Sequence, residues 1–299
     1  MVSPIGESWP MTTREQWIAG ARPKTLAAAI APVLVGTAFA GYNVRAFHAF
    51  LALIVALALQ IGVNYANDYS DGIKGTDSDR IGPLRLVGSG IATPESVRNA
   101  ALISFAVAAS AGLILAARTS WLLILIGALA LVAAWTYTGG PKPYGYLALG
   151  EASVFIFFGL VATMGTYFVQ VESLSREVFL GSIAMGAFAC AILVLNNLRD
   201  REKDALVGKQ TLAVILGDEN TRNLYRWLIF SAYAVVAILS FSSLYFILVI
   251  ASLPLASRLV RRVTGVAENR ELIPLLAQTG RLQVIYALLI SFAALLTAR

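Results

Sequence analysis

Long apolar runs separated by short polar segments form the dominant pattern of the chain. Each run approaches the roughly 20 apolar residues that a membrane-spanning helix needs, so we count about nine spans. The runs begin near Thr25, Ala46, Val97, Ser120, Leu147, Val178, Leu224, Phe241 and Arg281. The pattern therefore predicts an all-α, polytopic membrane protein, with about nine transmembrane helices in a single bundle around a central cavity.

Composition supports this interpretation and adds an orientation. Hydrophobic residues make up 58% of the 299 residues and charged residues only 13%, which excludes an ordinary soluble domain. We expect one domain over residues 1–299, in which residues 1–20 form a polar N-terminal cytoplasmic segment. All but four of the 23 Lys and Arg residues fall on one predicted side, the exceptions being Arg45, Arg118, Arg176 and Arg299. Because basic residues concentrate on the cytoplasmic side, the N-terminus is predicted to lie inside.

The net charge of +6 follows from this distribution and does not call for a nucleic-acid partner. The single cysteine, Cys190, lies in an apolar run, which predicts a packing role and excludes an intramolecular disulfide.

Two polar clusters end apolar runs on the predicted cytoplasmic side, residues 64–71 and residues 196–204. Side chains four residues apart share a helix face, so Asn67 stacks with Asp71 and Asn64 pairs with Asp68. By the same spacing, a three-rung ladder of oxygens is formed by Asn196, Asp200 and Asp204. Charged and polar side chains at membrane depth are costly and usually face a cavity in which they bind something.

The residue types in these clusters favour a magnesium diphosphate as the ligand. Carboxylate and amide oxygens are hard ligands of the kind Mg²⁺ prefers, with the remaining positions left to water or phosphate. Basic side chains that can grip phosphate oxygens surround the acids; they are Lys74, Arg80, Arg85, Arg199, Lys203 and Lys209. Each cluster is followed by a glycine and a lysine, which suggests two related halves that face one cavity.

A third polar segment, residues 137–146, joins two predicted spans on the same side and is rich in Gly, Pro and Tyr. Tyr137, Tyr144 and Tyr146 are either ordinary interfacial aromatics or cavity-lining rings whose faces stabilise a cationic intermediate.

Two other readings of the clusters remain open at this stage. Paired intramembrane acids also occur in cation-coupled transporters, although those place their acids near the midplane of the bilayer. Helix capping explains one or two aspartates but not six Asn and Asp positions in two ladders.

In these motifs the chain resembles the UbiA superfamily of intramembrane prenyltransferases, and within it the 1,4-dihydroxy-2-naphthoate polyprenyltransferase (MenA) branch. The superfamily motif Asn-Asp-x-x-Asp-x-x-x-Asp is matched at Asn67, Asp68 and Asp71, with Gly75 at its last position. The branch pattern continues through Asp77 and through Asp79-Arg80-Ile81-Gly82-Pro83-Leu84-Arg85. Residues 137–146 and 196–214 also resemble that branch.

The resemblance implies transfer of a polyprenyl group from polyprenyl diphosphate to 1,4-dihydroxy-2-naphthoate, with loss of carbon dioxide, in menaquinone biosynthesis. It also implies a Mg²⁺ cofactor, contact with membrane lipid, and an active site at the cytoplasmic face of a bacterial inner membrane. The implied metal ligands are Asn67, Asp68, Asp71, Asn196, Asp200 and Asp204. The implied diphosphate-binding and catalytic residues add Lys74, Arg80, Arg85, Lys209, Tyr137 and Tyr144, and weaker candidates for binding an anion are Arg22 and Lys142. A different aromatic acceptor, such as 4-hydroxybenzoate, is the alternative with the same chemistry.

Overall fold

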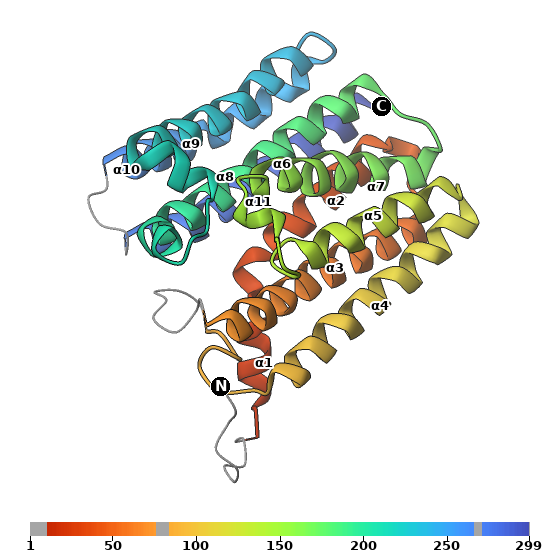
Figure 1. The fold of residues 1–299 in the computed structure, drawn as a ribbon. Helices are drawn as coiled ribbons and strands as arrows, with labels where there is room; N and C mark the ends of the chain where they lie inside the picture. The colour runs from red at the N-terminus through yellow and green to blue at the C-terminus, as the bar shows by residue number, and fades with distance from the viewer. Residues whose placement is uncertain (1–10, 76–83, 266–270, 299) are drawn as a thin grey trace, which may run out of the picture.

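A computed structural model describes residues 11–75, 84–265 and 271–298, and it is a bundle of long, closely packed helices (Figure 1). Its α-helices are α1 (Arg14–Gly20), α2 (Ala27–Phe39), α3 (Ala46–Lys74), α4 (Pro94–Arg118), α5 (Leu122–Thr136), α6 (Gly150–Val154), α7 (Ala162–Val171), α8 (Arg176–Leu206), α9 (Leu212–Leu239), α10 (Leu253–Gly265) and α11 (Leu272–Thr297). The shorter elements are the 3₁₀ segments η1 (Pro23–Thr25), η2 (Gly41–Asn43), η3 (Tyr144–Tyr146) and η5 (Leu244–Ser252), and the π-helical segment η4 (Phe155–Val161).

Every predicted apolar run coincides with a helix or a chain of helices, which confirms the all-α membrane fold. The prediction of about nine spans is too high by this measure: six helices or helix chains in the described part are long and apolar enough to cross a membrane, and a seventh is the pair formed by residues 14–25 and α2, bent by 53°. Helix α5, for example, is apolar but has only 15 residues. Two boundaries differ from the prediction, because α9 begins at Leu212 and α11 at Leu272, well before the runs at Leu224 and Arg281. The first turn of α9 is apolar, but residues 217–223 are polar and include an ion pair between Arg222 and Asp218 (2.5 Å), which apolar periodicity does not detect.

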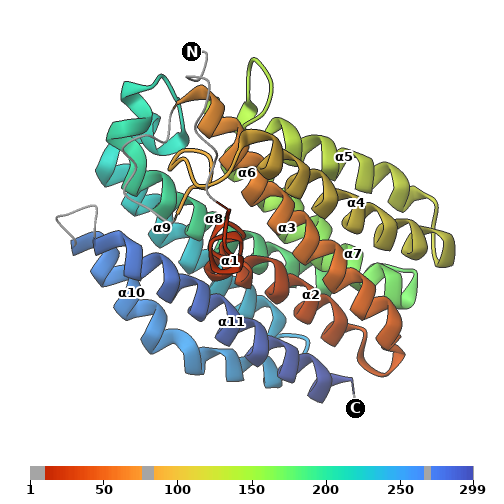
Figure 2. The same ribbon diagram turned by 90° about the horizontal axis from the view of Figure 1, so that it is seen from below.

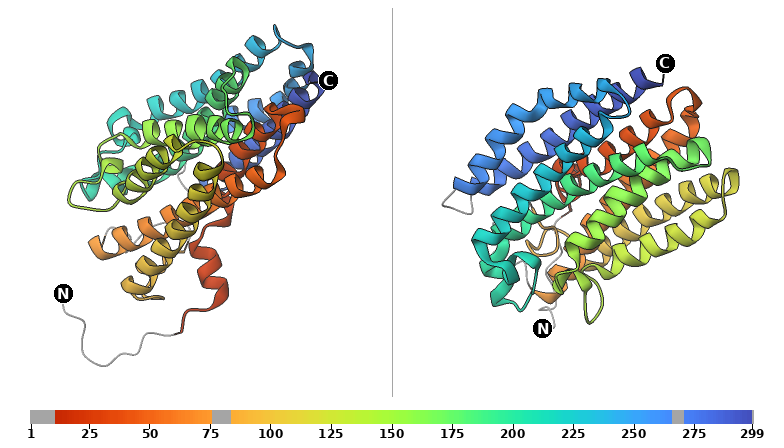
Figure 3. Two further views of the ribbon diagram at one scale, coloured as in Figure 1. Left: turned by 90° about the vertical axis from the view of Figure 1, so that its right-hand side faces the viewer. Right: turned by 90° about the horizontal axis from the view of Figure 1, so that it is seen from above.

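Helices α8 to α11 lie on one side of the bundle and α3 to α5 on the other, as the view from below shows (Figure 2). Helix α2 and the α6–α7 chain lie between them, since α2 packs against α3, α7, α8 and α11. The loops that follow α3, α5 and α8 gather at one end of the bundle, the end at which α1 also lies, and α11 ends at the opposite end (Figure 3). The two polar clusters therefore meet at the same end.

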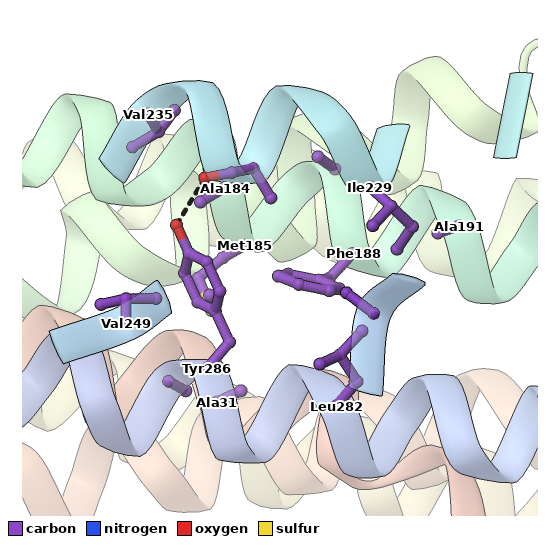
Figure 4. Packing of buried hydrophobic residues seen from close by; sticks show 14 of the residues in the cluster. Ala31, Ala184, Met185, Phe188, Ala191, Ile229, Val235, Val249, Leu282 and Tyr286 are labelled. Carbon is purple, nitrogen blue, oxygen red and sulfur yellow. Dashed lines mark hydrogen bonds between the residues drawn. The ribbon is translucent and has the colours of Figure 1, made fainter. Parts of the chain in front are cut away.

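The group of α8, α9 and α11 has the most fully buried core (Figure 4). The rings of Phe188 and Tyr286 pack edge to face with centroids 4.9 Å apart. The Tyr286 hydroxyl is buried, and it donates to the backbone oxygen of Ala232 on α9 (2.6 Å). A buried tyrosine needs such a partner, so this bond joins α11 to α9 inside an otherwise apolar core.

Glycines permit two close helix crossings. A Cβ on Gly36 of α2 would lie 2.3 Å from the backbone oxygen of Thr163 on α7. A Cβ on Gly159 of η4 would lie 2.5 Å from the Cα of Gly186 on α8. Small residues allow backbones to approach this closely, which is how helices gain packing contacts inside a membrane.

The substitution Gly159→Ala tests this packing. Its added methyl meets backbone atoms that cannot rotate away, so we expect it to lower the free energy of unfolding by about 1–3 kcal/mol. Thermal unfolding in detergent measures the change. The matched control is Gly165→Ala on the adjoining α7, where an added Cβ meets nothing within 4 Å; equal melting temperatures for the two variants would contradict the prediction.

Candidate active site

One large cavity, of about 1150 Å³, is lined mainly by α2, α3, α5, the α6–α7 chain and α8. Its lining divides by polarity. Polar and charged side chains line the end near the loops: Arg22, Asn67, Asp71, Arg85, Thr138, Asn196, Asn197, Arg199, Asp204 and Lys209. Apolar side chains and glycines of α5 and of the α6–α7 chain line the rest, among them Leu123, Ile126, Gly127, Phe157, Val161 and Gly165.

Asp71 is the centre of the polar end. Its carboxylate is 3% exposed and is approached from three different segments of the chain. The Tyr146 hydroxyl donates to Oδ1 (2.7 Å), Lys209 Nζ donates to the same oxygen (3.3 Å), and Arg85 Nη2 lies 3.4 Å from Oδ2. A buried carboxylate needs such compensation, so these contacts hold three loops around the last turns of α3.

The neighbouring residues of α3 hold the loop after α5. The Thr138 hydroxyl donates to Asn67 Oδ1 (2.7 Å), and Lys74 Nζ donates to the backbone oxygen of Thr138 (2.7 Å). Asn67 lines the cavity, whereas Lys74 does not, and its ammonium lies 5.0 Å from the centre of the Tyr146 ring. Lys74 therefore acts on the loop rather than on the cavity.

Asp68 points away from the cavity. Both of its oxygens accept backbone hydrogen bonds, from Leu86 N (2.8 Å) and Val87 N (3.1 Å), and its side chain is fully buried. Asn64 donates instead to the backbone oxygen of Ala21 (2.9 Å) and the hydroxyl of Thr25 (3.1 Å). The predicted Asn64–Asp68 pair thus joins surrounding segments, and a metal-binding role for Asp68 stays a prediction that this geometry does not favour.

The ladder on α8 is also divided. Asn196 and Asp204 line the cavity, but Asp200 does not. Arg199 holds Asp200 through two charge-assisted bonds, from Nε (2.8 Å) and Nη2 (2.7 Å), and Nη2 also donates to Asn196 Oδ1 (2.8 Å). Because Asp200 does not line the cavity and both of its oxygens accept from Arg199, the three predicted ligands are not equivalent.

Of the weaker candidates, Arg22 lines the cavity while Lys142 is exposed and lies outside it. Arg22 has a left-handed backbone conformation (φ 54°), at the bend between α1 and α2. Arg80 and Asp77 lie outside the described residues.

Tyr137 and Tyr144 line the cavity together, as an edge-to-face pair with centroids 5.5 Å apart. The Tyr144 hydroxyl donates to the backbone oxygen of Ala133 and also lies 2.8 Å from the hydroxyl of Ser153. Burial raises the pKa of both phenols, and the nearby Glu151 carboxylate raises that of Tyr137 further. Both tyrosines therefore stay protonated at neutral pH.

Sequence reasoning did not single out two residues that the structure brings to this region, Glu151 and Asn197, and it named Tyr146 and Arg199 without the contacts that they make. The Tyr146 ring has the Lys209 ammonium 4.6 Å from its centre and its hydroxyl on Asp71. The sequence placed Tyr146 in a loop with Tyr137 and Tyr144, and nothing in the spacing showed which of the three would contact Asp71. Nothing in the spacing of Glu151 marks it.

The cavity oxygens fit a magnesium ion that is shared with a phosphate ligand. In the part of the chain described by the structure, no three His, Cys, Asp or Glu side chains cluster closely enough to hold a metal alone. Mg²⁺ is usually bound by one or two carboxylates together with water and substrate phosphates. Asp71 and Asp204, with the amides of Asn67 and Asn196, are a donor set of that kind.

Comparison with known proteins identifies close relatives. The model of the UbiA prenyltransferase family matches residues 29–273. The chain is 48% identical, over 95% of its length and 98% of the relative's, to a 1,4-dihydroxy-2-naphthoate octaprenyltransferase of Mycobacterium tuberculosis. It is 40% identical to the Escherichia coli protein of the same name, over 77% of this chain and 78% of that one.

Solved structures share the fold. A UbiA homologue from Archaeoglobus fulgidus bound to DMAPP and Mg²⁺ superimposes with a TM-score of 0.67 at 16% identity, over 94% of this chain and 99% of that one. An apo UbiA homologue from Aeropyrum pernix K1 gives a TM-score of 0.68 at 14% identity, over 92% and 98% of the two chains.

The two aspartates of α3 are separable by experiment. We expect Asp68→Ala to lower the free energy of unfolding by about 1–3 kcal/mol, because the amides of Leu86 and Val87 lose their acceptor in a buried place. Thermal unfolding in detergent measures this loss. If Asp68→Ala melts like the parent protein but loses its dependence on Mg²⁺, Asp68 is a metal ligand and our reading of it is wrong.

Proposed function

This chain belongs to the UbiA prenyltransferase family, and on that premise we propose that it transfers a polyprenyl group from polyprenyl diphosphate to 1,4-dihydroxy-2-naphthoate. It is a multi-pass membrane prenyltransferase whose relatives in Mycobacterium tuberculosis and Escherichia coli have names that specify this acceptor and an octaprenyl donor. Carbon–carbon bond formation with loss of the acceptor's carboxylate as carbon dioxide gives demethylmenaquinone, a step of menaquinone biosynthesis.

The observation that carries the proposal is the division of this cavity into a polar and an apolar part. One end brings Arg22, Arg85, Arg199 and Lys209 together with Asp71 and Asp204, and the other end is apolar. An isoprenoid diphosphate has the same division, with a strongly anionic head and a long hydrocarbon tail. A transporter for small cations has no use for the apolar part.

The cationic side chains at the polar end bind the diphosphate and stabilise its charge as it leaves. Lys209 and Arg85, both buried beside Asp71, are placed to contact phosphate oxygens. A guanidinium grips two oxygens at once, whereas the lysine supplies a compact charge. Fixed positive groups in a site shielded from water stabilise the developing negative charge of a leaving group strongly.

Magnesium, when bound, would be held by Asp71, Asp204, Asn67 and Asn196 and would neutralise part of the diphosphate charge. Asp68 and Asp200 serve this ion indirectly, by holding Leu86, Val87 and Arg199 in place. The aromatic acceptor binds against Tyr137 and Tyr144, whose ring faces also favour a nearby allylic cation.

The prenyl tail follows the apolar part of the cavity between α5 and α7. Burial of hydrocarbon gives about 0.8 kcal/mol per CH₂ removed from water, so a long tail anchors the donor. The concentration of basic residues near the polar end supports a cytoplasmic location for this end in a bacterial inner membrane, with the N-terminus inside.

Turnover by the purified protein in detergent tests the function. With Mg²⁺, octaprenyl diphosphate and 1,4-dihydroxy-2-naphthoate, mass analysis should show a decarboxylated prenyl naphthoquinol that disappears when EDTA is added. Product from 4-hydroxybenzoate alone would overturn the acceptor, and no product from either would overturn the function.

The substitution Asp71→Asn tests the polar end. We expect turnover per folded protein to fall by at least about a hundredfold, because the leaving diphosphate loses a group that organises Lys209, Arg85 and the metal. Lys142→Ala, at an exposed residue outside the cavity, is the matched control and should leave turnover unchanged. Equal losses in the two variants would contradict the assignment.

The tail path generates a second prediction. Gly127 and Gly165 line the cavity, and an added Cβ at either meets nothing within 4 Å. Gly127 is ten residues from Tyr137, which places it about 15 Å along the helix from the tyrosine wall. We expect Gly127→Leu and Gly165→Leu to reduce kcat/KM for octaprenyl diphosphate about tenfold relative to geranyl diphosphate, since only the long tail reaches them.

The alanine variants at these two glycines are the controls, and both should keep the parent's preference for donor length. If the leucine variants reduce the use of geranyl and octaprenyl diphosphate equally, the tail takes another path.

A further inference from the structure

Glu151, in the first turn of α6, is a carboxylate near the cavity to which the proposed reaction gives no role. Its Oε1 accepts a hydrogen bond from Asn197 Nδ2 on α8 (3.0 Å). Its Oε2 is buried and has no hydrogen-bond partner in the described part of the chain. The ion pairs among the described residues involve other acids and not Glu151. A side chain that only balances charge would sit beside a cation, so its contact with Asn197 needs another explanation.

The backbone around Glu151 is held independently of its carboxylate. Cys190 Sγ donates to the backbone oxygen of Glu151 (3.1 Å), which links the start of α6 to α8. A Cβ on Gly150 would lie 3.1 Å from the hydroxyl of Tyr137, so the tyrosine packs directly on this turn. The turn is held mainly by the packing of Tyr137 on Gly150, because a thiol is a weak donor and the Cys190 contact adds little. The carboxylate of Glu151 is not needed for this packing and acts on Asn197.

The bond to Glu151 determines which way the Asn197 amide points. An asparagine amide carries a donor at one atom and an acceptor at the other, and its two orientations differ only in the hydrogen bonds they make. A carboxylate oxygen accepts, so it takes the Nδ2 end. Asn197 lines the cavity, and its remaining atom, Oδ1, is thereby available to it as a hydrogen-bond acceptor.

An acceptor at this place matches one of the two proposed substrates and not the other. Diphosphate oxygens carry negative charge and only accept, so Oδ1 has nothing to bind there. The aromatic acceptor has ring hydroxyl groups, which donate. The site for its ring is close by, because Tyr137 and Tyr144 form the adjoining cavity wall and Tyr137 packs on the turn that holds Glu151.

We propose that Glu151 is a positioning residue that turns the amide oxygen of Asn197 toward the cavity, where this oxygen accepts a hydrogen bond from a ring hydroxyl of the aromatic substrate. The inference rests on the proposed function, since it assigns a site to the acceptor of that reaction. The bond orients the ring and increases the electron density of the carbon that forms the new bond. Glu151 itself does not touch the substrate.

The experiment compares Glu151→Ala, Glu151→Gln, Asn197→Ala and the double alanine variant in detergent, with Cys190→Ala as the control for the position of the turn. KM is measured separately for the aromatic acceptor, for the prenyl diphosphate and for Mg²⁺. We expect Glu151→Ala to raise KM for the acceptor about tenfold, as the loss of a supporting hydrogen bond does, and to leave the other two constants unchanged.

The remaining variants test whether Glu151 affects the acceptor KM through Asn197. Glu151→Gln should stay close to the parent protein, because its amide oxygen still accepts from Asn197. The double variant should be no worse than Asn197→Ala alone, because Glu151 acts only through that residue. Cys190→Ala should leave the acceptor KM unchanged.

Three results would overturn the inference. Additive losses in the double variant would show that Glu151 acts independently of Asn197. A rise in KM for Mg²⁺ or for the prenyl diphosphate would assign the Asn197 oxygen to the metal or the donor. An unchanged acceptor KM in Asn197→Ala would remove the site altogether, and this variant keeps the test decisive if Glu151→Ala does not fold. Failure of the proposed function is distinct, because the parent protein would then make no product.

Discussion

The structure depends on hydrogen bonds and ion pairs that stabilise one buried carboxylate, that of Asp71, at the end of a membrane helix. An ionised group without partners in a water-poor place would cost several kcal/mol, so its surroundings must bring donors to it. Here the donors come from the loop after α3, the loop after α5 and the loop after α8, through Arg85, Tyr146 and Lys209. The same contacts that stabilise the charge close the polar end of the cavity, and a backbone bond from Gln210 N to Tyr146 O (3.0 Å) joins two of those loops.

One helix end serves several purposes because its neighbouring faces point in different directions. Asn67 and Asp71 share the face that looks into the cavity, while Asp68, one residue from Asn67, lies on the face that packs against residues 84–92. Gly75 then ends α3 in a left-handed conformation (φ 69°), which a glycine adopts without strain. Gly208 has the same conformation after the cluster on α8 (φ 76°), so both halves end their polar helices in the same way.

The sequence was sufficient for the fold class, the family and the meeting of the two polar clusters at one end of the bundle. Long apolar runs and two Asn/Asp clusters are strong local signals, and the contact between Lys209 and Asp71 brings the clusters together as the pattern predicted. What spacing could not assign was the partner of each carboxylate. Asp68 and Asp71 look alike in the motif, yet one accepts from backbone amides and the other from side chains of the cavity, and that difference depends on loops folding back from elsewhere. Likewise, spacing could not distinguish the contacts of Tyr146 from those of the other tyrosines in its loop, or those of Asn197 from those of Asn196.

Glu151 and Gly127 illustrate the two kinds of information that only packing supplies. A glutamate in a helical first turn is ordinary, and it becomes notable only when Asn197 and Tyr137, from two other helices, are found against it. From sequence alone, a glycine in an apolar run is interpreted as a residue that allows close helix packing, and Gly159 is one. The structure shows that Gly127 is not, because an added Cβ there would meet nothing within 4 Å. The same residue type therefore closes the bundle at one crossing and leaves room for a ligand at another, and the difference is set by how far apart the flanking helices are held.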